Sequence, residues 1–152
     1  MSAIDTVSFF DTLATTMNAD PQQYEVLGDV DMDIAVVMQR DGGDDFRVLL
    51  SFRGIACEGV SEIEAGDELT ADCRLVGPLA AWQAMFDDIA EHGHATGRQT
   101  INSLTLLGDD IVVQGSDPLG VDKFFRFNQT VQAFVDGAGT HAAAVETSSA
   151  TA

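Results

Sequence analysis

The chain has 152 residues, which is the size of one ordinary domain and long enough to bury a single compact core. Asp and Glu number 25 against seven Lys and Arg, which gives a formal net charge of −18. An acidic surface repels phosphate backbones and anionic headgroups, so nucleic-acid binding and electrostatic membrane docking are disfavoured. Solubility or a salt-rich habitat would also account for the acidity.

The N-terminal segment predicts two helices and no targeting signal. It carries no positive stretch and no long apolar run, so we expect neither a signal peptide nor a membrane anchor, and a cytoplasmic location. Residues 4–17 form an amphipathic pattern with Asp5 in the first turn, where a carboxylate interacts favourably with the helix dipole. Asp20 is a candidate N-cap for a short helix over 21–28, which turns Tyr24 inward.

The middle of the chain alternates with a period of two, which is typical of strands. Residues 33–38 and 46–52 flank the turn-rich sequence RDGGDD and predict a hairpin. Residues 55–60 continue the antiparallel sheet after a bend at Gly54. Residues 68–76 alternate most regularly, with apolar side chains at 69, 71, 73 and 75 and polar ones at 68, 70, 72 and 74. One face of the sheet is therefore expected to meet water.

The segment after residue 76 predicts a helix, and the secondary structure of the segment that follows this helix has two interpretations. Gly77 is expected to end the preceding strand, and Pro78 to open a helix with an ordinary core-facing stripe. After it, a second hairpin would place strands at 104–107 and 111–114 around the turn GDD. The alternative is a short helix at 101–107 followed by one strand.

The last helix is expected over 117–136, with Gly137 as its stop and a disordered tail over 140–152. Its apolar arc is roughly 180° wide, against roughly 100° for a helix that only covers a sheet. Such a helix either meets two apolar surfaces or borders an apolar cavity, which indicates an apolar ligand or a partner protein. The arc consists of Val121, Phe124, Phe125, Phe127, Val131, Phe134 and Val135.

No enzyme signature is recognisable in the sequence. A nucleophile elbow, a phosphate-binding loop and a dinucleotide fingerprint are all missing. His92 and His94 point apart on a helix without a third ligand, and the aspartates at 29–33 lack the Gly and Glu of a calcium loop. Cys57 and Cys73 lie on expected strands, which favours buried free thiols over a disulfide. We therefore predict no catalytic residue, no metal site and no cofactor.

An apolar pocket between two helices and the sheet is the best candidate for a site. A solid core is an equally open alternative, because each aromatic ring buries roughly 150–250 Å². The amide of Asn128 either bonds the backbone or offers a ligand a polar group. The candidate ligand-binding residues are Trp82, Met85, Phe86, Phe124, Phe127, Asn128, Val131 and Phe134.

The order of elements predicts one α+β domain over 1–139, with helices gathered on the apolar face of an antiparallel sheet. The stretches ADCRLVGPLAAWQAMFDDI and DDIVVQGSDPLGVDKFF resemble the sterol carrier protein 2 superfamily. Members share a strand, a small-residue turn, a Trp-containing helix, a short strand ending in Gly and an apolar closing helix. These features correspond here to Ala71–Leu75, Gly77, Trp82 with Met85 and Phe86, Ile111–Gly115 and Leu119–Val135.

The resemblance implies a five-stranded antiparallel sheet, a tunnel for fatty acyl chains, sterols or other lipids, and a soluble non-enzymatic carrier. One alternative is a homodimer or an accessory subunit of a lipid or steroid catabolic enzyme, with the aromatic C-terminal helix as the interface. The other is an isomerase or hydrolase of the nuclear transport factor 2 type, which also begins with helices and encloses an apolar pocket.

Overall fold

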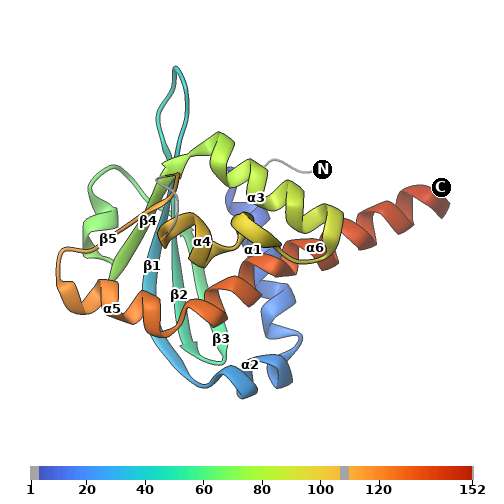
Figure 1. Cartoon of the computed structure of the whole chain (residues 1–152), viewed down its shortest axis with the longest axis horizontal. Coiled ribbons are helices and arrows are strands. Elements are labelled where there is room, and N and C mark those ends of the chain that lie inside the picture. The colour runs from blue at the N-terminus through green and yellow to red at the C-terminus, as the bar shows by residue number, and fades with distance from the viewer. Residues whose placement is uncertain (1–3, 107–109, 152) are drawn as a thin grey trace.

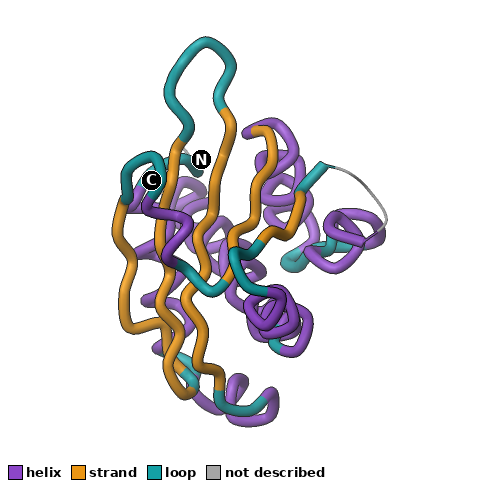
Figure 2. Tube along the Cα trace, turned by 90° about the vertical axis from the view of Figure 1, so that its left-hand side faces the viewer, coloured by secondary structure: helices purple, strands orange, loops and turns teal. Residues whose placement is uncertain are grey.

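The computed structural model describes residues 4–106 and 110–151, which form a five-stranded sheet with helices on one of its faces (Figures 1 and 2). The helices are α1 (Val7–Asn18), α2 (Pro21–Leu27), α3 (Leu79–His92), α4 (Ile101–Leu106), α5 (Pro118–Arg126) and α6 (Asn128–Thr151). The strands are β1 (Val30–Gln39), β2 (Phe46–Gly54), β3 (Ala56–Glu62), β4 (Cys73–Pro78) and β5 (Val112–Gln114). Two 3-10 turns are η1 (Asp67–Thr70) and η2 (Gly97–Gln99).

Strand β1 is the centre of the sheet, whose order is β3-β2-β1-β4-β5. It pairs antiparallel with β2, which confirms the predicted hairpin, but parallel with β4. The remaining pairs are antiparallel, so the sheet is mixed and mostly antiparallel. The α+β class is confirmed. The parallel pair arises because the connection from β3 to β4 crosses two strands instead of making a tight turn.

The crossing connection corrects the expected strand over 68–76. Residues 67–70 form η1, and Leu69 is 52% exposed instead of facing the core. The carboxylate of Glu68 pairs with Arg47 at 3.4 Å, which holds η1 on the face of the sheet that the helices leave open. Strand β4 also runs through Gly77, where a side chain would collide with the backbone of Asp110. Gly77 therefore permits a close approach of two segments and does not end the strand.

The core lies between the sheet and helices α1, α3 and α6. Aromatic pairs in edge-to-face geometry connect the helices with one another and with the sheet. Phe9 of α1 lies 4.8 Å from Phe86 of α3 between ring centroids, and Phe52 of β2 lies 5.2 Å from Phe134 of α6. These buried rings join α1 to α3 and α6 to the sheet.

Two expectations for the N-terminal helices are wrong in detail. Helix α1 begins after Thr6, whose hydroxyl accepts a hydrogen bond from Phe9 N. Asp5 lies before the helix and pairs with Arg40 at 3.0 Å, so it is not a first-turn residue. Asp20 occupies the N-cap position of α2, but its side chain makes no capping hydrogen bond. Tyr24 is buried, as predicted.

The expected single closing helix is two helices. The chain leaves α5 at Phe127, with φ −108° and ψ 18°, and then enters α6, which runs in a different direction in Figure 1. The 180° arc therefore does not exist, because Phe124 belongs to α5, whereas Val131 and Phe134 belong to α6.

Helix α6 also continues past the expected stop. Gly137 and Gly139 lie where α6 crosses Thr16 of α1 and Gly93 after α3, so they allow close helix packing within a helix that runs to Thr151. The domain boundary at 139 and the disorder of the tail beyond it stay predictions.

The segment after α3 forms a short helix and one strand, which is the second of the two structures considered for it. Helix α4 and the single strand β5 replace the hairpin, while Leu107 and part of the GDD turn lie outside the described residues. Within the part of the chain that the structure describes, no helix combines the length and apolar character needed to cross a bilayer.

Candidate functional site

The structure gathers most of the candidate residues in one apolar layer between the sheet and helices α3, α5 and α6. We call this set the apolar layer, and each member is at most 4% exposed. Phe127 and Asn128 are only half-buried. The apolar layer consists of Trp82, Met85, Phe86, Phe124, Val131 and Phe134.

The aromatic rings of the apolar layer contact different neighbours. Phe86 packs on Phe9, Phe134 packs on Phe52, and Phe124 lies 5.1 Å from Phe125. The partners Phe9 and Phe52 come from α1 and β2, which the sequence pattern had not linked to the site. The layer is thus filled by rings from five elements.

Trp82 contributes a hydrogen-bonded polar atom, its indole nitrogen, to the apolar layer. The indole nitrogen of Trp82 donates a hydrogen bond to the carbonyl oxygen of Val37 at 3.3 Å, which joins α3 to β1. Among the described residues, Thr130 is the one polar or charged residue classed as buried. The interior offers a ligand apolar contacts and almost no hydrogen-bonding groups.

Helix α4 is attached to α6 by two side-chain hydrogen bonds. The Asn128 amide donates to Asn102 Oδ1 at 3.3 Å, and Gln132 Oε1 accepts from the backbone nitrogen of Ile101 at 2.7 Å. Asn128 therefore bonds a side chain of α4. This short helix closes one end of the apolar layer with the buried side chains of Ile101 and Leu104.

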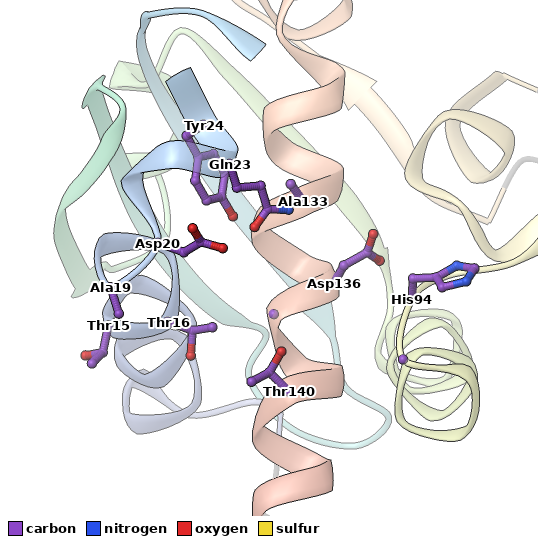
Figure 3. Close-up of a pocket in the computed structure, with 12 residues that line it drawn as sticks. Thr15, Thr16, Ala19, Asp20, Gln23, Tyr24, His94, Ala133, Asp136 and Thr140 are labelled. Carbon is purple, nitrogen blue, oxygen red and sulfur yellow. The ribbon is translucent and has the colours of Figure 1, made fainter. Parts of the chain in front are cut away.

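A groove of ≈ 570 Å³ lies between α1, α2 and α6, at the end of α3 (Figure 3). We call it the α2–α6 groove. None of the eight candidate residues lines it. Its walls combine apolar surface with polar side chains, among them Asp20, Tyr24, His94 and Asp136. No pattern in the sequence indicates this groove, because residues from 15 to 140 assemble it only after folding.

A smaller hollow of ≈ 270 Å³ lies between α3 and α4. It borders the core, because Leu104 belongs to the core and Ala81 packs against it. The side-chain oxygen of Gln99 is buried at this hollow and has no hydrogen-bond partner among the described residues. An unpaired buried acceptor is costly unless a ligand or water donates to it.

The two cysteines are free and buried, as predicted. Burial raises the pKa of the Cys57 thiol to about 11 and that of Cys73 to about 12. Both are therefore thiols near neutral pH, which argues against nucleophilic catalysis by either. In the described part of the chain, no group of three His, Cys, Asp or Glu side chains is arranged to hold a metal ion.

We predict that neither cysteine of the native protein reacts with iodoacetamide near neutral pH, and that both react in denaturant. Intact mass would show no adduct and then two. The same burial makes stability fall as pH rises from the ordinary thiol value of 9.0 towards about 11, because the unfolded chain loses these protons first. Rapid labelling of the native protein would contradict the buried positions.

Comparison with known proteins gives structural matches only. No protein-family model matches the sequence, and no curated protein matches it significantly. A conserved hypothetical protein of Thermus thermophilus, for which a sterol carrier role has been suggested, superimposes with a TM-score of 0.69 at 19% identity, over 89% of this chain and 87% of that chain. The crystal structure of sterol carrier protein 2 also gives 0.69, at 18% identity, over 90% of this chain and 97% of that chain.

These identities are low, so the matches concern the arrangement of the backbone. The similarity extends over nearly the whole length of this chain and of both matched chains. These matches argue against the alternative of a nuclear transport factor 2 type enzyme, because the cone-shaped sheet of that type is a different fold from the one observed here. The chain therefore has the fold of sterol carrier protein 2, as the resemblance in its sequence implied.

Proposed function

We propose that the protein is a soluble, non-enzymatic carrier that holds an apolar ligand, such as a fatty acyl chain or a sterol, between the sheet and the helices. The observation that carries this proposal is the apolar layer itself, enclosed by a fold whose solved examples include a sterol carrier protein. Removing apolar area from water contributes about 25 cal/mol per Å², which is the driving force such a carrier needs.

The core is suited to rearrange around a ligand. Four methionines among the described residues are buried: Met17, Met32, Met38 and Met85. Methionine is unbranched and flexible, so it can change rotamer to make room for an apolar molecule at low cost. The described hollow between α3 and α4 supports entry at that place, because Leu104 joins it to the core. There, the unpaired oxygen of Gln99 can accept a hydrogen bond from a ligand hydroxyl.

The test uses Trp82, which is the chain's single tryptophan and is 1% exposed. We expect palmitic acid, palmitoyl-CoA or cholesterol to change Trp82 fluorescence saturably and to raise the melting temperature, because a ligand of the native state stabilises it. Organic extraction of the purified protein, followed by mass spectrometry, would identify a retained lipid. An empty extract together with no response to all three lipids would overturn the proposal.

A pair of variants tests the place of entry. Ala84→Leu adds bulk to the hollow at an exposed position of α3 and should weaken lipid binding without unfolding the protein. Gln22→Leu adds a similar side chain at an exposed position of α2, outside the hollow, and should leave binding unchanged. Equal affinity in both variants would place entry elsewhere.

The alternative of an interface on the aromatic C-terminal helix gains no support from side-chain exposure. Phe124 and Phe134 are at most 1% exposed, and Phe125 and Phe127 are half-buried. These rings are occupied within the domain, so a partner would find little aromatic surface on α5 and α6.

A further inference from the structure

The hollow between α3 and α4 contains a polar atom whose hydrogen bonding is incomplete. Gln99, the last residue of η2, lines this hollow, and its Oε1 atom is buried without a hydrogen-bond partner among the described residues. The Nε2 atom of the same side chain is not in that condition. Since an amide oxygen is an acceptor, the partner that Gln99 lacks is a donor.

Gln99 differs from the two other buried side chains in the described chain that have an atom without a hydrogen bond. Asp33 Oδ1 lies 3.0 Å from the guanidinium nitrogen Nη2 of Arg53. Arg47 Nε lies 3.4 Å from the carboxylate of Glu68. Each of these atoms therefore has an opposite charge beside it. Gln99 Oε1 has no such neighbour within the described residues, although buried polar groups nearly always have a partner.

The side chains around Gln99 cannot supply the missing donor. Asp110 carries a carboxylate, which only accepts hydrogen bonds, and it adds a negative charge at the hollow. No Lys or Arg is among the described residues that line the hollow, in a chain whose formal net charge is −18. The donor must therefore come from a ligand or from water. The other lining residues have no polar side-chain atom: Pro78, Ala80, Ala81, Ala84 and Leu104.

The hollow has room for the polar end of a lipid. Its ≈ 270 Å³ is several times the roughly 30 Å³ of one water molecule, which is enough for a head group and the first carbons of its chain. Gln99 is only half-buried, and its long side chain can change rotamer to turn Oε1 towards a ligand. Leu104 belongs to the core and Ala81 packs against it, so an apolar chain can continue inward from this point.

We propose that this hollow selects lipids by their polar end and favours a neutral hydroxyl group over a carboxylate. The inference rests on the proposed carrier function and narrows the class of lipid that is carried. A hydroxyl donates to Gln99 Oε1 and so completes the hydrogen bonding of this buried acceptor. An ionised carboxylate has no donor, and both Asp110 and the net negative charge of the protein repel it.

Three ligands with the same alkyl chain separate the hydrogen bond from the charge: 1-dodecanol, methyl laurate and laurate. Their binding is followed by the fluorescence of Trp82, which directly follows Ala81 in the sequence, at mildly alkaline pH and at laurate concentrations below micelle formation. Dodecanol should bind about tenfold more tightly than methyl laurate, because only the alcohol has a donor for Gln99. Laurate should bind more weakly than the ester, since it also carries a negative charge.

The possible failures of this test are distinguishable. Equal affinity for dodecanol and methyl laurate would contradict the proposal, because water would then suffice as the donor to Gln99. Laurate bound as tightly as dodecanol would contradict it as well. If none of the three ligands bound, the carrier function itself would be refuted, and with it the selectivity that rests on it.

Three variants separate the hollow from general differences between the ligands. Gln99→Leu removes the acceptor and should weaken dodecanol binding about tenfold, to the affinity of methyl laurate. The melting temperature of the free variant should not fall, because the lost oxygen has no partner in the described chain. Asp110→Asn should tighten laurate binding about twofold and leave dodecanol unaffected. Asp122→Asn removes the same charge at an exposed position of α5, outside the hollow, and should change none of the affinities. Undiminished dodecanol binding by Gln99→Leu, or equal effects of the two aspartate variants, would overturn the proposal.

The hydroxyl can belong to a linear alcohol or to a sterol, which share this chemistry. Cholesterol delivered from cyclodextrin distinguishes the two sources. A loss of cholesterol affinity in Gln99→Leu as large as the loss for dodecanol would support the proposal with a sterol among the ligands. A loss confined to dodecanol would support it with a linear alcohol as the ligand.

Discussion

The variant Gly120→Ala is expected to lose at least about 3 kcal/mol of stability, or to fail to fold. Gly120 is buried in α5 against the strand entry at Asp72, and a Cβ there would overlap the carbonyl oxygen of Asp72. Two hydrogen bonds attach the backbone at Asp72 to strand β1. Asp72 N donates to the Asp33 carbonyl at 3.0 Å, and Asp33 N donates to Asp72 Oδ2 at 2.8 Å. The clash must therefore displace α5.

Urea denaturation of Gly120→Ala and of Gly43→Ala measures this effect. Gly43 lies in the loop between β1 and β2, where a Cβ would meet nothing within 4 Å and φ is not positive. Its replacement should change the free energy of unfolding by less than about 1 kcal/mol. A Gly120→Ala protein as stable as the Gly43→Ala control would show that α5 is not in close contact with Asp72.

The second large effect is expected for Phe134→Ala, at about 3–5 kcal/mol of lost stability. Phe134 is 1% exposed and meets Phe52 edge-to-face at 5.2 Å, so its removal leaves a cavity between α6 and β2. The residue also belongs to the apolar layer. The same variant therefore tests how firmly this layer is packed.

The matched control is Phe127→Ala at the junction of α5 and α6, because Phe127 is only half-buried. Its cost should be less than half of that for Phe134→Ala, since less apolar area is lost. Chemical denaturation with a common slope gives both values. If Phe134→Ala cost no more than Phe127→Ala, the ring would border an empty space, and the apolar layer would already contain a cavity for a ligand.

The apolar layer and the α2–α6 groove are different environments. The side chains of the apolar layer are buried and packed against one another, whereas the groove is open and is lined by both apolar and polar side chains. Trp82 and Tyr24 each occur once in the chain, and they lie in the apolar layer and beside the groove, respectively. Spectroscopy can therefore report on the two environments independently in the unmodified protein.

Local residue patterns were sufficient to predict which side chains are buried in most of the elements. Alternation placed the β1–β2 hairpin, and a helical stripe placed Trp82, Met85 and Phe86 of α3 in the core. Periodicity is informative here because each of these elements has one apolar and one polar face. The order of such elements was also enough to indicate the fold.

What each apolar or polar face meets became visible only in the folded chain. The parallel pairing of β1 and β4, the exposure of Leu69 and the break at Phe127 depend on how distant segments cross, and a local pattern carries no record of the partner. The α2–α6 groove is the clearest case. Asp20 and Asp136 are 116 positions apart in the sequence. Both line the groove beside Tyr24 only because α6 packs next to α1 and α2. The burial of a side chain can be predicted from the local spacing of apolar residues, whereas a groove or pocket depends on the packing of segments that are distant in the sequence.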